Sequence, residues 1–554
     1  MEISEGGSDA LTGLTATKLW PRRLLDVTRM KSFERKGGNM YGHSREPAYS
    51  VISYTWGRWQ TSDGPRLQID GITWKVPALK GAFAVEEFHR VLIRVGERTG
   101  GLVWVDIACI DQENYAVKMD EIGRQAGIFQ NASFAYVWLW TLPKVTLKAS
   151  VDTLLTLPTV DRVQEKFRGS NEVDTMRQLL QAVSHILRDG WFSSLWTLQD
   201  AFLRTDAVCL PLEGEYINPR PGWRSIYIGS VMRDIWKILM DLDDETQRFD
   251  DPQANELAAL LRERIREAGL IADPISENPN IQYGACRFRK TTKELDRIYG
   301  IMAIYDIQVG AAVPGADTTK AQSLEGLEQE FAAILNARSP FLGQYFVHLS
   351  RPIEGKSWQI TQNSRVPWCD YLFTSNGFRR LNDCTITAVS GEAYAKLQGL
   401  SLPLEIVFEY WKAALCKAPE AKKVATGAHK YLYPDYWHVV LDDHICKGYP
   451  SLPYMGLDYF QPSQAIGEHA YHLVSELLAL ATFAETVSVV VLGEEPSNHW
   501  PSRTFGLLIL HQEVDRTQCQ RIGVCAWETC PEGFDAELEK DWVLRWRKYE
   551  GIIH

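Results

Sequence analysis

Short apolar runs alternate with longer amphipathic stretches through the N-terminal part of the chain. Four runs have the two-residue period or the continuous apolarity of buried strands: 48–56, 102–110, 134–140 and 206–210. The stretches that follow them carry apolar residues at helical spacing and predict helices: 79–97, 114–131, 174–188 and 191–204. This alternation of strands and helices predicts an α/β sheet whose strands run parallel.

Outside this alternation, the pattern predicts other elements. LQIDGITWKV (67–76), with its Asp-Gly step, predicts a short hairpin. Between about 225 and 345 the hydrophobic spacing is helical, in four stretches: 226–242, 254–272, 294–306 and 324–337. Further on the pattern is mixed, and three short runs predict an antiparallel piece near the C-terminus: 487–493, 504–511 and 520–527.

These patterns predict four parts along the chain. A flexible lead (1–18) precedes an α/β domain over 19–215, which we expect to be a parallel sheet with flanking helices. A helical extension packed on that domain follows over 216–345, and a mixed α+β region of unknown role spans 346–554. A chain of 554 residues is too long for one ordinary core, so more than one unit is expected.

Composition and charge narrow the class of protein. The 59 basic and 70 acidic residues give a net charge of −11 without a basic run, which argues against nucleic acid as the main partner. The acidic N-terminus lacks the features of a signal peptide, and the longest apolar run, 477–493, contains Glu485 and is too short for a membrane span. We therefore expect a cytoplasmic protein without membrane contact. The ten cysteines form no C-x-x-C pair, so no metal site is predicted.

The stretch WVDIACIDQ (104–112) carries the first candidate chemistry. Carboxylates are rarely buried unless paired, and sites in parallel α/β sheets form beyond the carboxyl ends of strands. Asp106, Cys109 and Asp111 straddle such an end. Each has a structural alternative, because either aspartate could begin a helix and Cys109 could be an inert buried thiol. DDHIC (442–446) lacks ligand spacing and is interpreted as a loop.

Six blocks of sequence, in order across about 19–306, resemble the fungal heterokaryon incompatibility (HET) domain. The blocks are LWPRRLLDV (19–27), YSVISYTWG (49–57), WVDIACIDQ (104–112), YVWLW (136–140), WFSSLWTLQDAFL (191–203) and TTKELDRIYGIMAIYD (291–306). The resemblance implies a flavodoxin-like sheet similar to TIR domains, a fungal source, and a role in non-self recognition and cell death. It also implies self-association through this domain.

The resemblance further implies a site. Some TIR relatives cleave NAD at the nicotinamide glycosidic bond with a carboxylate, which stabilises an oxocarbenium-like centre. That position falls on Asp200, one helical turn after Trp196, a candidate stacking wall. NAD is thus a candidate substrate if the protein is a TIR-like enzyme, and no other cofactor is predicted. The candidate catalytic residues are Asp200, Asp106 and Asp111, and the candidate ligand-binding residues are Ser53, Tyr54, Trp56, Gly57, Cys109, Gln112, Trp196 and Gln199.

Several residues depart from the family pattern. Asp200 stands where the family usually has Glu, Ser194 where it has Arg, Asp111 where it has Asn, and Trp140 where it has Gly. These changes suggest a weakened or repurposed site. Three hypotheses remain open: a HET-type effector, an enzyme of fungal secondary metabolism that binds a small molecule in a rebuilt pocket, and an inactive protein that acts through contacts. A cationic run could bind an anionic ligand or form a solvated face; it comprises Arg287, Arg289, Lys290 and Arg297.

Overall fold

The computed structural model describes most of the chain, and its residues fall into two units. The described residues are 19–55, 60–61, 64–79, 83–156, 172–218, 225–243, 249–271, 274, 278–367, 384–407, 438–448, 487–495, 503–512, 517–528 and 545–554. The N-terminal unit contains the described residues between Leu11 and Ile275 together with Ala285–Leu327. The C-terminal unit contains those between Ser276 and Gly284 and those from Glu328 to His554.

A six-stranded sheet forms the core of the N-terminal unit. Its order is β10-β9-β5-β8-β1-β2, with the bounds Val208–Leu210, Phe134–Trp138, Ser50–Ser53, Leu102–Trp104, Arg23–Asp26 and Lys31–Glu34. β10, β9, β5 and β8 run parallel, as predicted, and every residue of β5 is buried because neighbouring strands and helices cover it on all sides. The sheet is mixed, however, since β1 and β2 join it antiparallel at one edge.

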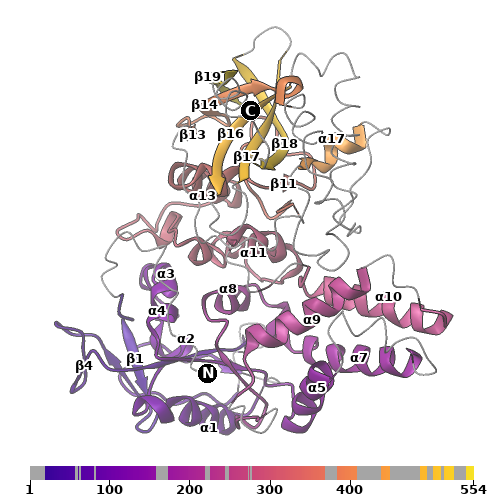
Figure 1. Cartoon of the computed structure of the whole chain (residues 1–554). Coiled ribbons are helices and arrows are strands. Elements are labelled where there is room, and N and C mark those ends of the chain that lie inside the picture. The colour runs from indigo at the N-terminus through magenta and orange to yellow at the C-terminus, as the bar shows by residue number, and fades with distance from the viewer. Residues whose placement is uncertain are drawn as a thin grey trace, which may run out of the picture. The chain divides into compact units, whose positions relative to one another are not determined.

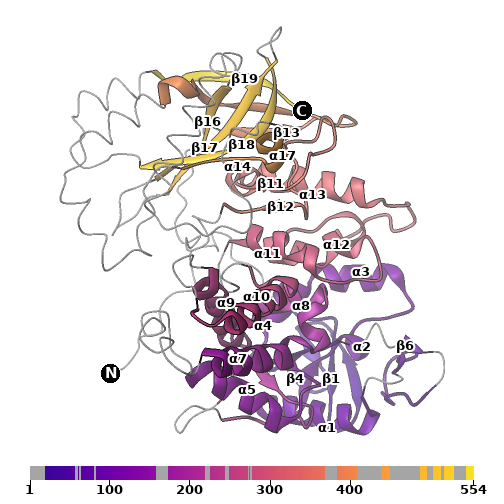
Figure 2. The same cartoon turned by 90° about the vertical axis from the view of Figure 1, so that its right-hand side faces the viewer.

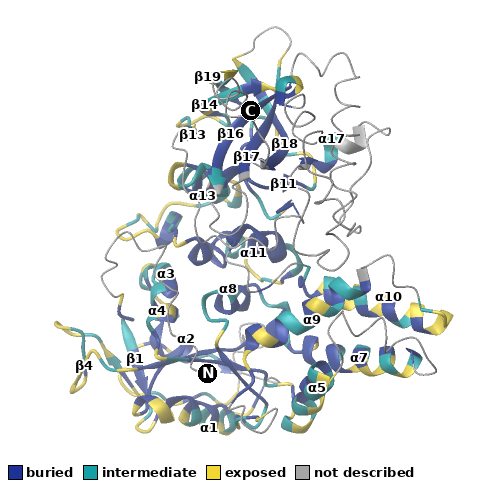
Figure 3. Ribbon diagram, viewed as in Figure 1, coloured by how far each residue is buried: buried dark blue, intermediate teal, exposed yellow. Residues whose placement is uncertain are grey.

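Helices lie on both faces of this sheet. Those of the N-terminal unit are α1 (Val85–Gly96), α2 (Asp106–Cys109), α3 (Tyr115–Gly123), α4 (Gln125–Asn131), α5 (Lys144–Thr156), α7 (Glu172–Leu187), α8 (Trp196–Leu203), α9 (Ile228–Asp243), α10 (Pro252–Glu267) and α12 (Asp296–Tyr299). Short 3₁₀ turns accompany them: η2 (Glu97–Thr99), η3 (Gly190–Ser193), η4 (Cys286–Phe288), η5 (Met302–Tyr305) and η6 (Gly310–Ala312). Figure 1 shows α1 on one face and α2, α4 and α8 on the other. Figure 3 shows the strands buried and the exposed residues of α1 and α10 turned outward.

Five predicted elements differ from the structure. The helices expected over 191–204 and 294–306 each divide into a 3₁₀ turn and a short α-helix, η3 with α8 and η5 with α12. The strand expected over 102–110 ends at Trp104, and Asp106–Cys109 form a helical turn, because a continuous apolar run fits a buried helix as well as a strand. The helix expected over 114–131 divides at Arg124 into α3 and α4. α3 ends at Gly123, which lies close to the Ala312 carbonyl. A Cβ atom on residue 123 would lie only 2.5 Å from that carbonyl oxygen.

The hairpin expected over 67–76 is also wrong. This segment bonds to the sheet instead of to itself, since Asp70 accepts from the Ser32 amide (2.8 Å) and donates to the Met30 carbonyl (2.9 Å). Gly71 makes the turn at φ +79°. Two small pairs lie outside the main sheet, β3–β4 (Met40–Tyr41, Ser44–Arg45) and β6–β7 (Gln60–Thr61, Ala78–Leu79). Figure 2 shows β6 at the margin of the unit, apart from the sheet.

The C-terminal unit contains a closed five-stranded barrel. Its strands form the ring β14-β16-β17-β18-β19, with the bounds Ala395–Pro403, Val487–Glu495, Arg503–His511, Gln518–Glu528 and Arg547–Ile553, and β19 pairs back with β14. The three predicted antiparallel strands are confirmed as β16, β17 and β18. The other elements are α11 (Pro279–Ala285), α13 (Leu324–Arg338), α14 (Pro340–Gln344), α17 (Asp443–Gly448), β11 (Val347–His348), β12 (Ser364–Arg365), β13 (Thr385–Ala388) and β15 (His438–Leu441).

A buried ion pair stabilises the C-terminal unit. Both Asp442 carboxylate oxygens accept from Arg521 Nη1, at 2.7 and 2.9 Å, and both side chains are fully buried. Asp442 Oδ1 also accepts from the backbone amide of His348 at 2.9 Å. Asp442 therefore has a structural role. The loop predicted over DDHIC (442–446) is wrong, because the helix α17 begins at Asp443. No helix among the described residues is long and apolar enough to cross a membrane.

Candidate functional site

A cavity of about 680 Å³ lies at the carboxyl ends of β5 and β8. The chain passes from β5 to β8 on one side and then to β9 on the other, so the cavity occupies the place where strand order reverses, the usual ligand site of open α/β sheets. Its walls come from five places: the end of β5, Lys75 with Pro77, the segment from the end of β8 through α4, the start of α8, and residues 290–299. All of them belong to the N-terminal unit.

Asp200 is the most deeply placed acid in this cavity. Ser53 Oγ donates to Asp200 Oδ2 at 2.7 Å, and Gln125 Nε2 lies 3.5 Å from Oδ1. Trp191 Nε1 donates to Ser53 Oγ at 2.8 Å and thereby orients the hydroxyl. The pKa of the Asp200 carboxyl is raised to about 7, chiefly by burial and also by the charge of Asp106, while the Ser53 hydrogen bond acts to lower it. This acid can therefore change its charge near neutral pH.

A tight turn before α8 sets the position of Asp200. The Asp189 carboxylate caps this turn by accepting from the Trp191 amide at 2.9 Å, and it also accepts from Thr141 Oγ1 at 2.6 Å. Thr197 Oγ1 donates back to the Trp191 and Ser194 carbonyls at the start of α8. These bonds satisfy backbone groups of the turn that precedes α8, and they hold α8 to that turn.

The second acid of the cavity, Asp106, follows β8. Asp106 Oδ1 accepts from Tyr54 OH and from the Ile107 amide, at 2.7 and 2.8 Å. Gln112 Nε2 donates to the Asp106 carbonyl (3.2 Å), and Lys118 Nζ donates to Gln112 Oε1 (2.9 Å). The sheet thus brings together Ser53, Tyr54, Asp106, Gln112, Trp196 and Asp200, all of which were predicted from the sequence and line the cavity.

Other predicted residues lie elsewhere. Cys109 is fully buried in the core, where burial raises its thiol pKa to about 12, so it cannot act as a nucleophile at neutral pH. The Asp111 carboxylate accepts from the Glu113 and Asn114 amides (both 3.0 Å) in a turn before α3, and it lines a separate shallow hollow. Gln199 is buried but does not line the cavity.

Three further residues that the sequence singled out can now be placed. Trp140 does not line the cavity, and its indole N–H donates to Thr55 Oγ1 at 3.2 Å. Ser194, the residue that stands in place of the usual Arg, does line it. Trp56 and Gly57 lie outside the described residues.

Sequence reasoning missed Gln125 and Lys118. Lys118 lies on α3 and Gln125 begins α4, on either side of the break at Arg124, and both line the cavity. Neither could be recognised from the sequence, because neither residue type is unusual on a helix surface and the break was not predicted. Lys293 and Asp296 were also missed as site residues, because nothing in the sequence indicates that they fold back over β5.

The downstream segment is held to α8 by backbone pairing. The Lys290 amide donates to the Ser193 carbonyl at 2.7 Å, and the Leu195 amide donates to the Lys290 carbonyl at 3.1 Å. Trp196 Nε1 donates to Asp296 Oδ2 at 3.1 Å, and Thr291 Oγ1 donates to the same oxygen at 2.9 Å. Residues 290–296 therefore form a fixed wall of the cavity.

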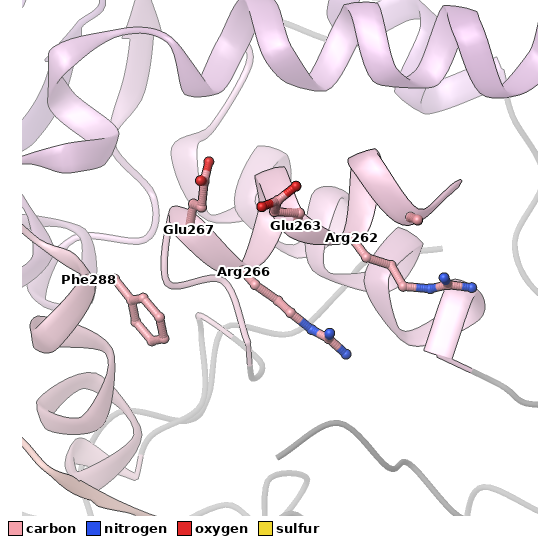
Figure 4. Close-up of a pocket in the computed structure, with 6 residues that line it drawn as sticks. Arg262, Glu263, Arg266, Glu267 and Phe288 are labelled. Carbon is pink, nitrogen blue, oxygen red and sulfur yellow. The ribbon is translucent and has the colours of Figure 1, made fainter. Parts of the chain in front are cut away.

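A hollow of about 370 Å³ beside α10 is a weaker candidate for a functional site. Figure 4 shows that its charged side chains diverge from one helix, with Glu263 and Glu267 pointing away from Arg262 and Arg266. Phe288 supplies the facing side. No buried acid or amide converges there, and among the described residues no group of His, Cys, Asp and Glu could hold a metal ion. The cavity at the end of β5 is the better candidate site.

Comparison with known protein families identifies this part of the molecule. Residues 49–200 match the family model described as heterokaryon incompatibility protein (HET). The chain carries a HET domain. Its matched range begins beside β5 and ends at Asp200, so the HET domain supplies β5, β8, β9 and most of α8, while residues 290–299 lie beyond the match. No curated protein and no solved structure matches the chain. The HET domain supports a heterokaryon-incompatibility-type function at the level of the family.

Proposed function

We propose that this HET-domain protein is an effector of fungal non-self recognition and cell death, and that its cavity binds and cleaves NAD. The observation that carries the proposal is Asp200, a buried acid that faces a cavity next to Trp196 and is held by Ser53 and Gln125. A carboxylate beside an aromatic wall suits a sugar ring bound through a positively charged base, because it can stabilise the cation that forms as the bond breaks. The similarity to TIR domains belongs to the same proposal.

The reaction breaks one bond and forms one. The bond between C1′ of the ribose and the nicotinamide nitrogen breaks, nicotinamide leaves as a neutral molecule, and positive charge spreads over C1′ and the ring oxygen. Ionised Asp200 stabilises this charge, and water then adds at C1′ and releases a proton. The products are ADP-ribose and nicotinamide.

The state of Asp200 is a direct consequence of its surroundings. Because its pKa is raised to about 7, about half of the carboxyl groups are ionised at that pH, and the ionised fraction grows as the pH rises. Nicotinamide release should therefore increase between pH 6 and pH 8. A carboxylate with the ordinary aspartate pKa would give a flat profile over the same range.

The test is an assay of nicotinamide release by the purified full chain beside Asp200→Asn and Asp152→Asn. Asn keeps the size and one carbonyl oxygen of the residue but cannot carry the charge, so Asp200→Asn should reduce release by about 10²-fold or more. Asp152 lies half-exposed on α5 in a surface pair with Lys148, and its change should leave release unaltered. No release from the folded parent protein at high concentration, or equal release from Asp200→Asn, would overturn the proposal.

A further inference from the structure

Four lysines line the cavity, and none of them forms an ion pair with another described residue. They are Lys75, Lys118, Lys290 and Lys293. Within the part of the chain that the structure describes, no carboxylate lies within ion-pair distance of any of their ammonium groups, and Lys118 Nζ donates only to the neutral amide of Gln112. The cavity therefore presents several positive charges that are available to a ligand.

The acids of the same cavity offset these charges only in part. The charges of Asp106 and Asp296 act to raise the pKa of Lys118, but neither acid forms an ion pair with it among the described residues. Neutral donors bind these acids instead: Asp200 accepts from Ser53, Asp106 from Tyr54, and Asp296 from Trp196 and Thr291. A ligand that carries both an anionic group and hydroxyl groups would meet both kinds of side chain.

The half-buried Lys118 also carries a free-energy cost that an anion would relieve. Burial lowers its pKa and the charge of Lys293 lowers it further, while the charges of Asp106 and Asp296 act to raise it, so the ammonium groups of Lys118 and Lys293 are close enough to repel each other. An anion between them would remove this repulsion and receive charge-assisted hydrogen bonds.

Two of these lysines, Lys290 and Lys293, lie beyond residues 49–200, which match the HET family model. Lys290 is fixed by its backbone bonds to Ser193 and Leu195, and Lys293 follows in the same segment, which the Trp196–Asp296 bond holds in place. Arg289 and Arg297, in contrast, donate to backbone carbonyls of the protein and serve the structure. The cationic run therefore divides into a structural part and a part that reaches the cavity.

We propose that Lys118, Lys290 and Lys293 form a phosphate-binding subsite, so that the cavity takes a phosphorylated nucleoside or sugar and the downstream segment completes its recognition. This assignment rests on the proposed function for the choice of NAD-like ligands. It is nevertheless a statement about binding, and it does not require that any bond is cleaved.

The experiment measures binding to the full chain by titration calorimetry with two probes. ADP-ribose carries a pyrophosphate, whereas adenosine carries the same base and ribose without it. The variants are Lys118→Met and Lys293→Met, which keep the length of the aliphatic chain, with Lys148→Met on α5 as the matched control. Lys293 is exposed, so its replacement leaves the fold intact even if the half-buried Lys118 proves sensitive.

We expect ADP-ribose to bind more tightly than adenosine, and each cavity variant to weaken ADP-ribose by about tenfold, as the loss of one charge-assisted hydrogen bond implies. Adenosine binding and the Lys148→Met control should not change, and raising the salt concentration should weaken only ADP-ribose. Equal binding of the two probes, no binding of ADP-ribose, or unchanged ADP-ribose binding in both cavity variants would overturn the proposal. Lysine-dependent binding of ADP-ribose without nicotinamide release would support the phosphate subsite and contradict NAD cleavage. Nicotinamide release that does not depend on the lysines would support NAD cleavage and contradict the phosphate subsite.

Discussion

At the scale of single residues, two buried acids show what separates a site from a packing detail. Burial raises the pKa of both Asp200 and Glu121 to about 7. Glu121 Oε1 accepts from the Arg22 amide at 2.9 Å, and the residue does not line the cavity, so its perturbed pKa reports burial alone. Asp200 combines the same shift with access to a cavity of ligand size. The pKa thus gains functional meaning only from the geometry around it.

Ser53→Ala should move the pH dependence of nicotinamide release to higher pH. The Ser53 hydroxyl donates to Asp200 Oδ2 and favours the ionised form, so its removal raises the pKa of Asp200 above its present value of about 7. The fraction ionised at pH 7 then falls, and the midpoint of the rising pH profile should shift by about one pH unit, in proportion to the lost hydrogen bond.

Trp191→Phe provides the comparison for this variant. It removes the indole N–H that donates to Ser53 Oγ but leaves the contact between Ser53 and Asp200. Its midpoint should move much less than that of Ser53→Ala. Equal midpoints for the parent protein and Ser53→Ala would show that Asp200 does not control the profile.

At the scale of elements, the cavity depends on how short segments meet at the sheet. α3 and α4 replace one long helix, and the close contact between Gly123 and the Ala312 carbonyl lies at their junction. This contact joins α3, which carries Lys118, to η6 further along the chain. The junction is therefore part of the scaffold that sets the cavity wall.

Gly123→Ala should destabilise the N-terminal unit by about 1–3 kcal/mol, because the new Cβ would lie 2.5 Å from a backbone oxygen that cannot move freely. Gly326→Ala in α13 is the matched control, since its new Cβ would meet only a Ser323 side-chain oxygen at 3.2 Å, and Ala favours a helix by up to about 1 kcal/mol. Chemical denaturation of the two variants and the parent measures the difference. A Gly123→Ala protein as stable as Gly326→Ala would mean that the contact is looser than described.

The sequence predicted the parts of this element structure that local patterns encode. The parallel strands β5, β8, β9 and β10 were placed from two-residue periodicity or continuous apolar runs. The position of Asp106 followed from the end of β8, whereas Asp200 was identified through the family resemblance. The division at Arg124 and the helical turn at Asp106–Cys109 were not predicted, because apolar periodicity cannot distinguish a broken helix from a whole one or a buried turn from a strand.

The place of residues 290–296 over the cavity could not be predicted for a different reason, although Lys290 belongs to a cationic run in the sequence. Lys290 pairs with Ser193 and Leu195 through backbone groups, and backbone bonds leave no mark on the choice of side chains. Asp296 meets Trp196 across a large separation in sequence, which a single sequence does not reveal. Long-range contacts of this kind complete the site, so the sequence identified its residues at the strand ends and, through the family resemblance, on α8, but not the wall that covers them.

At the scale of the whole molecule, the chain has two units with separate sources of stability. The N-terminal unit is built on its mixed sheet, whereas the C-terminal unit closes a barrel around its own apolar core and buries the Asp442–Arg521 pair. The cavity residues all lie in the N-terminal unit. Damage to one unit should therefore be separable from damage to the other.

Asp442→Ala should destabilise the C-terminal unit by about 3–5 kcal/mol, because it leaves the Arg521 charge buried without its partner. Differential scanning calorimetry should show that the unfolding transition of the C-terminal unit moves to a lower temperature than in the parent protein. ADP-ribose binding, measured below that temperature, should stay unchanged. Asp152→Ala, which breaks a half-exposed pair on α5, should alter the heat absorption little. If ADP-ribose binding is lost together with the barrel, the two units do not behave independently.

The backbone pairing of Lys290 with Ser193 and Leu195 has a consequence for synthesis of the protein. Ribosomes synthesise a chain from its N-terminus, and N-terminal domains begin to fold while the remainder is still being made. The strands and Asp200 emerge early, but the wall made by residues 290–299 emerges only after α9 and α10 have been translated. Nascent or prematurely terminated chains that end before this wall carry the acid without its enclosure, so the order of translation itself delays the moment at which the cavity is complete.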